Sequence, residues 1–244
     1  MRKFGLIGYP LTHSFSKKYF TEKFQREGIN DAVYELYPIK DIYELRDLLK
    51  STPDLKGLNV TIPYKQLVLR HLNSSANIPH GVRACNCIRI EKGKTFGHNT
   101  DVIGFEKSFK PGLKQFHKKA LILGNGGATA AVGFVFDQLK IEYKIVSRKI
   151  HDGSSLTYND LDSSILQAHT VIVNTTPLGM YPDIDSAPPI PYQFIGPRHY
   201  LFDLIYNPDK TSFLRRGEEQ GATIKNGLEM LELQAEESWR IWNQ

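Results

Sequence analysis

The feature that most constrains this chain is a glycine-rich turn between a short apolar strand and a helix of small residues. Residues 120–123 are the apolar strand. The turn and the start of the helix are Gly124, Asn125, Gly126, Gly127 and Ala128. Gly124 allows a tight turn, Gly126 lets backbone approach a pyrophosphate, and the helix N-terminus offers free N–H groups with a partial positive charge. This order predicts the dinucleotide site of a Rossmann-type fold.

The end of the next apolar strand, residues 143–146, indicates which dinucleotide binds. Folds that bind NAD place there a carboxylate that holds the ribose 2′-hydroxyl. In this chain the strand ends in Ser147, Arg148 and Lys149. Cations pair with a 2′-phosphate, which a carboxylate would repel, so the pattern predicts NADP. The alternative is an ordinary α/β turn, because a glycine turn alone is a weak signal.

Length, composition and charge fit an enzyme that binds small molecules. The 244 residues are enough for one large domain or two modest ones, and 41% hydrophobic with 23% charged residues is ordinary for a globular protein. The net charge of +5 is mild and scattered, so we expect small anionic ligands and no nucleic acid. We also expect no membrane partner, because no apolar run approaches a membrane span and no signal peptide precedes the first strand.

The two cysteines, Cys85 and Cys87, lie two residues apart and cannot join distant segments. Without further cysteines or clustered histidines, such a pair is more typical of small apolar core residues than of a metal site. We therefore expect no metal and a reducing, cytoplasmic setting.

Residues 1–101 show strands alternating with helices. Strands are expected at residues 4–7, 33–37, 57–60, 86–90 and 94–97. A helix capped by Ser16 and ended by Gly28 follows the first strand, and another covers residues 41–50. This pattern predicts an α/β domain with a largely parallel sheet and an antiparallel edge.

A second α/β domain follows a helix that begins at Asp101. Its strands are expected at residues 120–123, 143–146, 170–174, 200–204 and 222–224. Residues 176–198 contain six of the thirteen prolines, and a loop of this length usually covers a site. We expect the final helix, residues 227–242, to return to the first domain. Its predicted apolar stripe is Leu228, Leu231, Trp239 and Trp242.

Two motifs in the first domain carry polar side chains near strand ends. Ser14 and Ser16 straddle the start of a helix, where simple capping is an alternative explanation. Asn59 and Thr61 share one face of a strand, and Lys65 follows a proline bend. Converging amide, hydroxyl and amine groups would suit a polyhydroxylated ligand. The alternative is an edge strand with polar residues and a lysine in water.

Two further motifs lie at the boundary between the two domains and in the middle of the second domain. Asp101 is at the entry of a helix, where a carboxylate caps free N–H groups. Residues 171–180 form a buried strand that ends in a polar turn. The alternative explanation is that the polar turn has no function beyond ending the strand.

In combination these motifs closely resemble the shikimate dehydrogenase family, in the same order and over nearly the whole chain. The resemblance rests on His-Ser-Phe-Ser at 13–16, Asn-Val-Thr-Ile-Pro-Tyr-Lys at 59–65, Asn86, Asn-Thr-Asp-Val-Ile-Gly at 99–104, Gly-Asn-Gly-Gly-Ala at 124–128, Asn-Thr-Thr-Pro-Leu-Gly-Met at 174–180, Asp-Leu-Ile-Tyr-Asn-Pro at 203–208 and Asn-Gly-Leu-Glu-Met-Leu-Glu-Leu-Gln at 226–234.

The resemblance implies reversible NADP-linked oxidation of shikimate to 3-dehydroshikimate, in aromatic amino acid (chorismate) biosynthesis, by a monomer or homodimer. Residues 1–101, completed by a C-terminal helix at about 227–244, would bind substrate, and residues 102–226 would bind NADP. The implied catalytic residues are Lys65 and Asp101. The implied substrate contacts are Ser14, Ser16, Asn59, Thr61, Asn86, Tyr206 and Gln234. The implied cofactor contacts are Gly124, Asn125, Gly126, Gly127, Ala128, Ser147, Arg148, Lys149, Leu204 and Gly227.

The chain departs from the family's pattern at three places. Lys17 stands where a proline often follows the second serine, Ser147 stands where an asparagine is usual, and a second arginine after Arg148 is missing. We therefore expect the 2′-phosphate to be bound more weakly than in the family at large. Two rival functions are a quinate/shikimate dehydrogenase that also uses NAD and a non-catalytic NADP-binding regulatory module. The retained Lys65 and Asp101 argue against the second.

Overall fold

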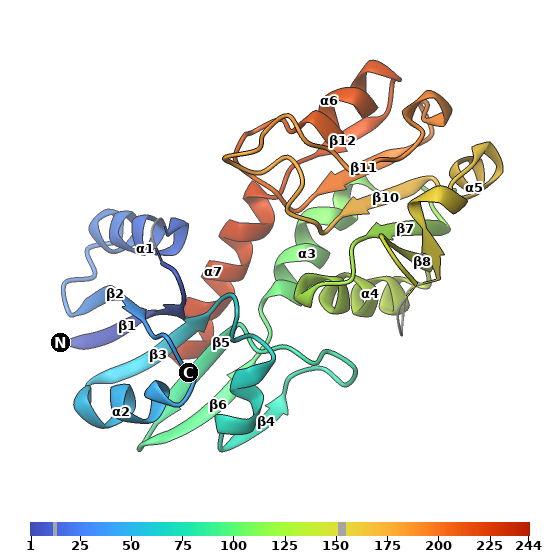
Figure 1. Ribbon diagram of the computed structural model, residues 1–244. Helices are drawn as coiled ribbons and strands as arrows, with labels where there is room; N and C mark the ends of the chain where they lie inside the picture. Colours follow the sequence, from blue (N-terminus) through green and yellow to red (C-terminus); the bar gives the residue numbers. More distant parts are fainter. Residues whose placement is uncertain (12–13, 151–154) are drawn as a thin grey trace. The chain divides into compact units, whose positions relative to one another are not determined.

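The structure is a computed structural model that describes residues 1–11, 14–150 and 155–244, so His13 of the serine motif lies outside the described residues. The chain divides into two compact units. Unit 1 consists of Met1–Thr100 and Gln234–Gln244, and unit 2 is Asp101–Leu233 (Figure 1). Each unit is built on one six-stranded sheet.

The sheet of unit 1 has the strand order β2-β1-β3-β5-β6-β4. Its strands are β1 (Arg2–Gly8), β2 (Ala32–Pro38), β3 (Leu55–Val60), β4 (Ser74–Asn77), β5 (Cys87–Glu91) and β6 (Lys94–His98). β1 is parallel to both β2 and β3, whereas β5 is antiparallel to β3 and β6. The predicted parallel sheet with an antiparallel hairpin is therefore confirmed. β4 and the 3-10 helix η1 (Leu67–His71) lack a clear periodic pattern and were not predicted.

Helices α1 (Phe15–Arg26) and α2 (Glu44–Ser51) follow β1 and β2 (Figure 1). Ser14, not Ser16, caps α1, because its Oγ accepts a hydrogen bond from the Lys17 N–H at 3.3 Å. The prediction that Ser16 is the cap was wrong by two residues. Either serine has the chemistry of a cap, and the sequence does not say which one keeps the extended backbone that a cap requires.

The C-terminal end of helix α7 (Leu228–Trp242) packs in unit 1. Trp242 stacks on Phe4, with ring centroids 5.0 Å apart, and its Nε1 donates to the Ile88 carbonyl. The helix therefore returns to the first unit as predicted. Its apolar stripe was predicted correctly only in part. Trp242 is buried and Trp239 packs against the same core, whereas Leu231 is half-buried and Leu228 is exposed. The buried residues of the helix are Met230, Gln234, Ala235, Ser238, Ile241 and Trp242.

Unit 2 has an all-parallel sheet with the order β12-β11-β10-β7-β8-β9. Its strands are β7 (Lys119–Leu123), β8 (Glu142–Ser147), β9 (Leu156–Thr157), β10 (Val171–Asn174), β11 (Tyr200–Asp203) and β12 (Thr223–Lys225). This is the doubly wound order of a Rossmann fold, in which the chain reverses its direction of progress between β7 and β10. The predicted α/β class with a Rossmann-type unit is confirmed. β9, with two residues, was too short to predict.

Both faces of this sheet are covered (Figure 1). Helices α3 (Asp101–Phe109) and α4 (Gly127–Leu139) pack on one face, where Phe105, Phe109 and Phe136 meet Tyr200 and Phe202 of β11. Helices α5 (Ser163–Ala168) and α6 (Ser212–Glu219) contribute to a separate cluster on the other face. Burial on both faces explains why β7, β10 and β11 are continuous apolar runs.

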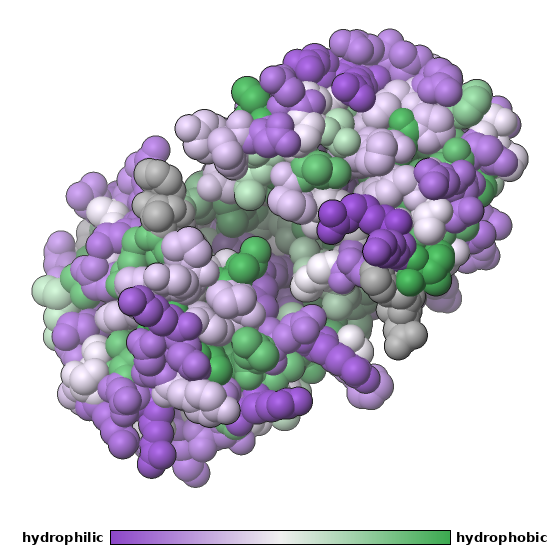
Figure 2. Space-filling model, in the orientation of Figure 1, coloured by the Kyte–Doolittle hydropathy of each residue, from purple (hydrophilic) through white to green (hydrophobic). Residues whose placement is uncertain are grey.

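Hydrophilic residues predominate on the face of the molecule shown in Figure 2, and hydrophobic residues appear there in separate small patches. Among the described residues no helix is long and apolar enough to cross a membrane.

Candidate active site

The glycine-rich turn lies at the carboxyl end of β7, at the point where the strand order of unit 2 reverses. Gly124 has φ +108°, and a Cβ there would lie 2.7 Å from the Thr175 hydroxyl, so only glycine fits. Gly126 precedes α4 as its N-cap, with φ −80°, and a Cβ on it would meet nothing within 4 Å. No part of the protein occupies the space beside Gly126, so the N-terminus of α4 is open to an anionic group.

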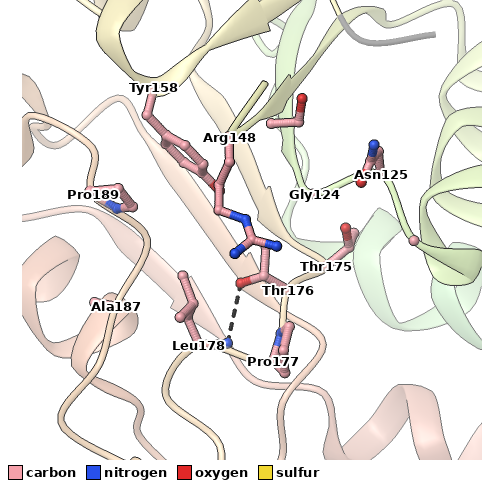
Figure 3. A pocket seen from close by; sticks show the side chains of 12 residues that line it. Gly124, Asn125, Arg148, Tyr158, Thr175, Thr176, Pro177, Leu178, Ala187 and Pro189 are labelled. Carbon is pink, nitrogen blue, oxygen red and sulfur yellow. Dashed lines mark hydrogen bonds between the residues drawn. The ribbon is translucent and has the colours of Figure 1, made fainter. Parts of the chain in front are cut away.

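A cavity of about 580 Å³ opens beside this turn (Figure 3). Five of the predicted cofactor residues line it: Gly124, Asn125, Gly126, Ser147 and Arg148. Figure 3 shows the Arg148 guanidinium pointing into the cavity, toward Thr176 on the opposite wall. The turn presents backbone N–H groups that suit the pyrophosphate of NADP. The guanidinium of Arg148, just beyond the neighbouring strand β8, suits its 2′-phosphate.

The other predicted cofactor residues do not line this cavity. Gly127 and Ala128 form the first turn of α4. Lys149 is exposed, and its carbonyl accepts a hydrogen bond from the Ser147 hydroxyl. Leu204 and Gly227 pack directly on each other, since a Cβ on Gly227 would overlap the Leu204 carbonyl.

Seven lining residues were not predicted as cofactor contacts: Tyr158, Thr175, Thr176, Pro177, Leu178, Ala187 and Pro189. All but Tyr158 follow β10 or belong to the proline-rich loop, so this loop forms part of the cavity wall. The sequence feature that could have identified the lining residues after β10 is the polar turn at the end of the 171–174 strand. That turn adjoins the glycine turn only because β10 pairs with β7.

Asp203, at the end of β11, holds the loops around the cavity in place. Its carboxylate is fully buried and accepts hydrogen bonds from Asn174 Nδ2 at 3.0 Å, the Ile205 N–H at 3.1 Å and Thr211 Oγ1 at 2.6 Å. Burial raises the pKa of Asp203 from 3.8 to about 6, and these three donors oppose the shift. Asn174 in turn accepts from the N–H and the hydroxyl of Thr176, which lines the cavity.

We expect Asp203→Asn to remove a pH dependence from the stability of the protein. Between the unfolded pKa near 4 and the folded pKa of about 6, the folded state binds more protons than the unfolded one, so stability falls as pH rises. The wild-type free energy of unfolding should therefore fall relative to the variant by about 2 kcal/mol between roughly pH 4 and 7.5. Urea denaturation of both proteins across this range measures the difference. Parallel curves would contradict it.

The candidate substrate residues of unit 1 gather at one edge of its sheet. Ser14 and Ser16 follow β1, while Thr61 and Lys65 follow β3, which is parallel to β1. Asn86 precedes β5, which is antiparallel to β3, so it lies at the same edge. The Thr61 N–H donates to the Ile7 carbonyl at 3.0 Å, which joins the ends of the two parallel strands.

A buried polar cluster lies beneath this edge. We define it as Tyr34, Asn59, Asn86, Thr100, Gln234 and Ser238, all of which are buried. The Tyr34 hydroxyl donates to Asn59 Oδ1 at 2.8 Å, and Asn59 Nδ2 donates to Ser238 Oγ at 3.0 Å. Thr100 Oγ1 lies 3.4 Å from Gln234 Oε1 and 3.2 Å from Ser238 Oγ. Asn59, Asn86 and Gln234 were predicted as substrate contacts. The residues that link them, Tyr34, Thr100 and Ser238, were not predicted.

Ser16 lies close enough to the Tyr34 hydroxyl to oppose the effect of burial on the pKa of that phenol. Burial raises the pKa of Tyr34 well above its ordinary value, so it remains a neutral donor. Asn59 has protein partners for its oxygen and both amide hydrogens, because Nδ2 also donates to the Asn86 carbonyl at 3.3 Å. Asn59 therefore stabilises the carboxyl end of β3 through hydrogen bonds within the buried polar cluster. Gln234 and Ser238 are four residues apart on α7, and this polar spacing within an apolar stripe was the available sequence signal.

Two neighbouring residues of unit 1, Cys85 and Asn86, hold the main chain at Lys65 and at Thr100. The Cys85 N–H donates to the Lys65 carbonyl at 2.7 Å. Asn86, the next residue, accepts the Thr100 N–H on Oδ1 at 2.6 Å and donates Nδ2 to Thr100 Oγ1 at 3.0 Å. Asp101 follows Thr100 directly and is the first residue of α3, where a carboxylate is favourable. Lys65 is half-buried and Asp101 is buried.

Tyr206 lies beyond β11 in unit 2 and is 36% exposed. Partial burial raises the pKa of its phenol, which therefore stays protonated near neutral pH.

Comparison with known proteins places the chain in a family. Residues 6–88 match the family model described as the shikimate dehydrogenase substrate binding domain. The shikimate dehydrogenase (NADP(+)) of Methanococcus maripaludis is 35% identical over 255 residues, which cover 98% of this chain and 90% of the relative. The chain belongs to the shikimate dehydrogenase family. The predicted family is confirmed, and with it the oxidoreductase class.

Solved structures of shikimate dehydrogenases have the same fold. Shikimate 5-dehydrogenase of Thermus thermophilus, in complex with NADP(H) and shikimate, aligns with a TM-score of 0.86 at 27% identity, over 99% of this chain and 93% of the other. The Listeria monocytogenes enzyme, in complex with shikimate and NAD, aligns with a TM-score of 0.87 at 27% identity, over 100% and 92%. Members of this family have thus been solved with either nicotinamide dinucleotide.

Proposed function

We propose that this protein catalyses the reversible NADP-linked reduction of 3-dehydroshikimate to shikimate in aromatic amino acid biosynthesis. In this proposal unit 1 binds the substrate and unit 2 binds NADP. The observation that carries the proposal is the cavity of unit 2, which joins a glycine-rich turn to Arg148 in a chain whose relatives are named for this reaction. The substrate-domain match over residues 6–88 lies within unit 1.

Lys65 and Asp101 are the residues that we propose to handle the proton. NADP supplies the hydride chemistry when it is bound, so the chain must hold the substrate and move one proton. In the direction of oxidation, the Lys65 amine accepts the proton of the substrate hydroxyl. In the direction of reduction, its ammonium donates a proton to the developing alkoxide. The Asp101 carboxylate orients the amine and accepts a hydrogen bond from a substrate hydroxyl.

The cofactor would be held by the two ends of the cavity in unit 2. The turn from Gly124 to Gly126 and the α4 N-terminus receive the pyrophosphate, whereas Arg148 pairs with the 2′-phosphate. We further propose a cytoplasmic protein that acts as a monomer or homodimer and binds no nucleic acid. Both cysteines are buried and free, in keeping with a reducing compartment.

The assay that tests the proposed function follows NADP reduction with shikimate, then replaces shikimate with quinate and NADP with NAD. We expect turnover with shikimate and NADP, and a much lower kcat/KM when either is replaced. Comparable rates with NAD and quinate would make the chain a quinate/shikimate dehydrogenase. Binding of NADP without turnover on either substrate would make it a regulatory module.

Gln234→Ala tests the proposed substrate site from the side of α7. Gln234 is only 7% exposed, which excludes a position at the solvent edge of the helix. Losing one hydrogen bond to the substrate should raise the KM for shikimate roughly tenfold and leave the KM for NADP unchanged. Glu232→Ala, at an exposed position of the same helix, is the matched control. An unchanged KM for shikimate would show that Gln234 serves only the buried polar cluster.

A further inference from the structure

The end of the cavity around Arg148 contains one cation and several hydroxyl groups. Arg148 is the only Lys or Arg among the cavity-lining residues that the structure describes. A phosphate monoester presents three terminal oxygens, and a guanidinium fork donates to two of them in parallel. A 2′-phosphate held by Arg148 therefore has an oxygen left for another donor.

Four hydroxyl groups line the cavity, and three are already committed as donors. The Ser147 hydroxyl donates to the Lys149 carbonyl. Thr175 Oγ1 donates to the Leu123 carbonyl at 2.8 Å, and Thr176 Oγ1 donates to Asn174 Oδ1 at 2.7 Å. The fourth is the Tyr158 phenol, which makes no hydrogen bond to any residue in the ranges 1–11, 14–150 and 155–244.

The register of the sheet places Tyr158 beside Arg148. β9 is parallel to β8, with Val146 opposite Leu156 and Ser147 opposite Thr157. The residues that follow these two strands, Arg148 and Tyr158, therefore leave the sheet side by side. Figure 3 shows the Tyr158 ring next to the Arg148 side chain on the same wall.

The backbone at Tyr158 is fixed by a local motif. Thr157 and Asp160 form a capping box, in which Asp160 Oδ2 accepts from the Thr157 N–H and Oγ1, both at 2.7 Å. Burial raises the pKa of Tyr158, although the nearby positive charge of Arg148 lowers it, so the phenol is a protonated donor in the field of the guanidinium. A neutral donor in a fixed position suits an anionic oxygen better than it suits a ribose hydroxyl.

We propose that the Tyr158 hydroxyl donates a hydrogen bond to the 2′-phosphate held by Arg148, which makes Tyr158 a second residue that selects NADP over NAD. This inference rests on the proposed function, because it concerns the cofactor of that reaction. The sequence offers no pattern that identifies Tyr158, since it depends on a two-residue strand and on its register with β8.

Binding of two small probes tests this role without turnover. Adenosine 2′,5′-bisphosphate carries the 2′-phosphate, and adenosine 5′-monophosphate lacks it. By calorimetry, we expect Tyr158→Phe to weaken the bisphosphate roughly tenfold or more, as for a hydrogen bond to a charged group, and to leave the monophosphate within about twofold. Tyr192→Phe is the matched control, because the Tyr192 hydroxyl donates to the Pro188 carbonyl and Tyr192 does not line the cavity.

The outcomes separate this inference from the proposed function. If the wild type prefers the bisphosphate and Tyr158→Phe leaves both affinities unchanged, the role of Tyr158 is wrong and the choice of NADP stands. An equal loss for both probes would make Tyr158 an adenine contact and would overturn its role in selection. A wild type that binds both probes equally would overturn the proposed cofactor and the role of Tyr158 together.

Discussion

Lys65→Ala should lower kcat by roughly 10²–10⁴-fold, the loss expected when a positioned acid–base group is removed, with a smaller change in the KM for shikimate. The main chain at Lys65 is held by the Cys85 N–H, a contact that the substitution leaves in place. The loss should therefore come from the missing amine and not from a displaced turn. Initial rates in both directions, with circular dichroism to show an unchanged fold, measure the effect.

Lys56→Ala is the control for this prediction, because Lys56 is an exposed lysine on β3, the strand that leads to the same turn.

Asp101→Asn should lower turnover to a similar extent and weaken shikimate binding more, because the carboxylate also accepts a hydrogen bond from the substrate. Near wild-type turnover in either catalytic variant would refute its assignment. A loss confined to KM would make that residue a binding group only.

Arg148→Ala should raise the KM for NADP roughly 10–100-fold, the range for losing hydrogen bonds between a cation and a phosphate, and should change the KM for NAD little. The guanidinium points into the cavity, and no carboxylate is among the lining residues that the structure describes. The ribose diol of NAD therefore has no strong partner to lose. Steady-state kinetics with the two cofactors at saturating shikimate give the comparison.

Lys144→Ala, which removes one exposed positive charge from the same strand, is the matched control for Arg148. It separates a specific contact from the general effect of lowering the protein's positive charge. Equal increases in the two KM values for Arg148→Ala would mean that the arginine supports the adenosine site without reading the 2′-phosphate.

The sequence by itself determined the fold class, the family and every strand of the two sheets except β4 and β9. These features rest on local physics. A buried parallel strand must be a continuous apolar run, and a helix that packs closely on the strand before it begins with small residues. The glycine-rich turn, Arg148 and the motifs around Lys65 and Asp101 were visible for the same reason, because each lies at a strand end or a helix start.

Only the tertiary structure decided which side chains meet. Tyr158 lies beside Arg148 through the register of β9 on β8, and Thr176 faces the cavity because β10 pairs with β7. Tyr34 meets Asn59 because β1 pairs with both β2 and β3, and Ser238 and Gln234 reach Asn59 and Thr100 only because the end of α7 packs in unit 1. Strand register and helix packing depend on the summed burial of residues far apart in the chain. A local pattern does not contain that sum, and for this reason it placed Leu228 in the buried stripe of α7 and missed Ser238. The cap of α1 was placed at Ser16 instead of Ser14 because either serine has the chemistry of a cap.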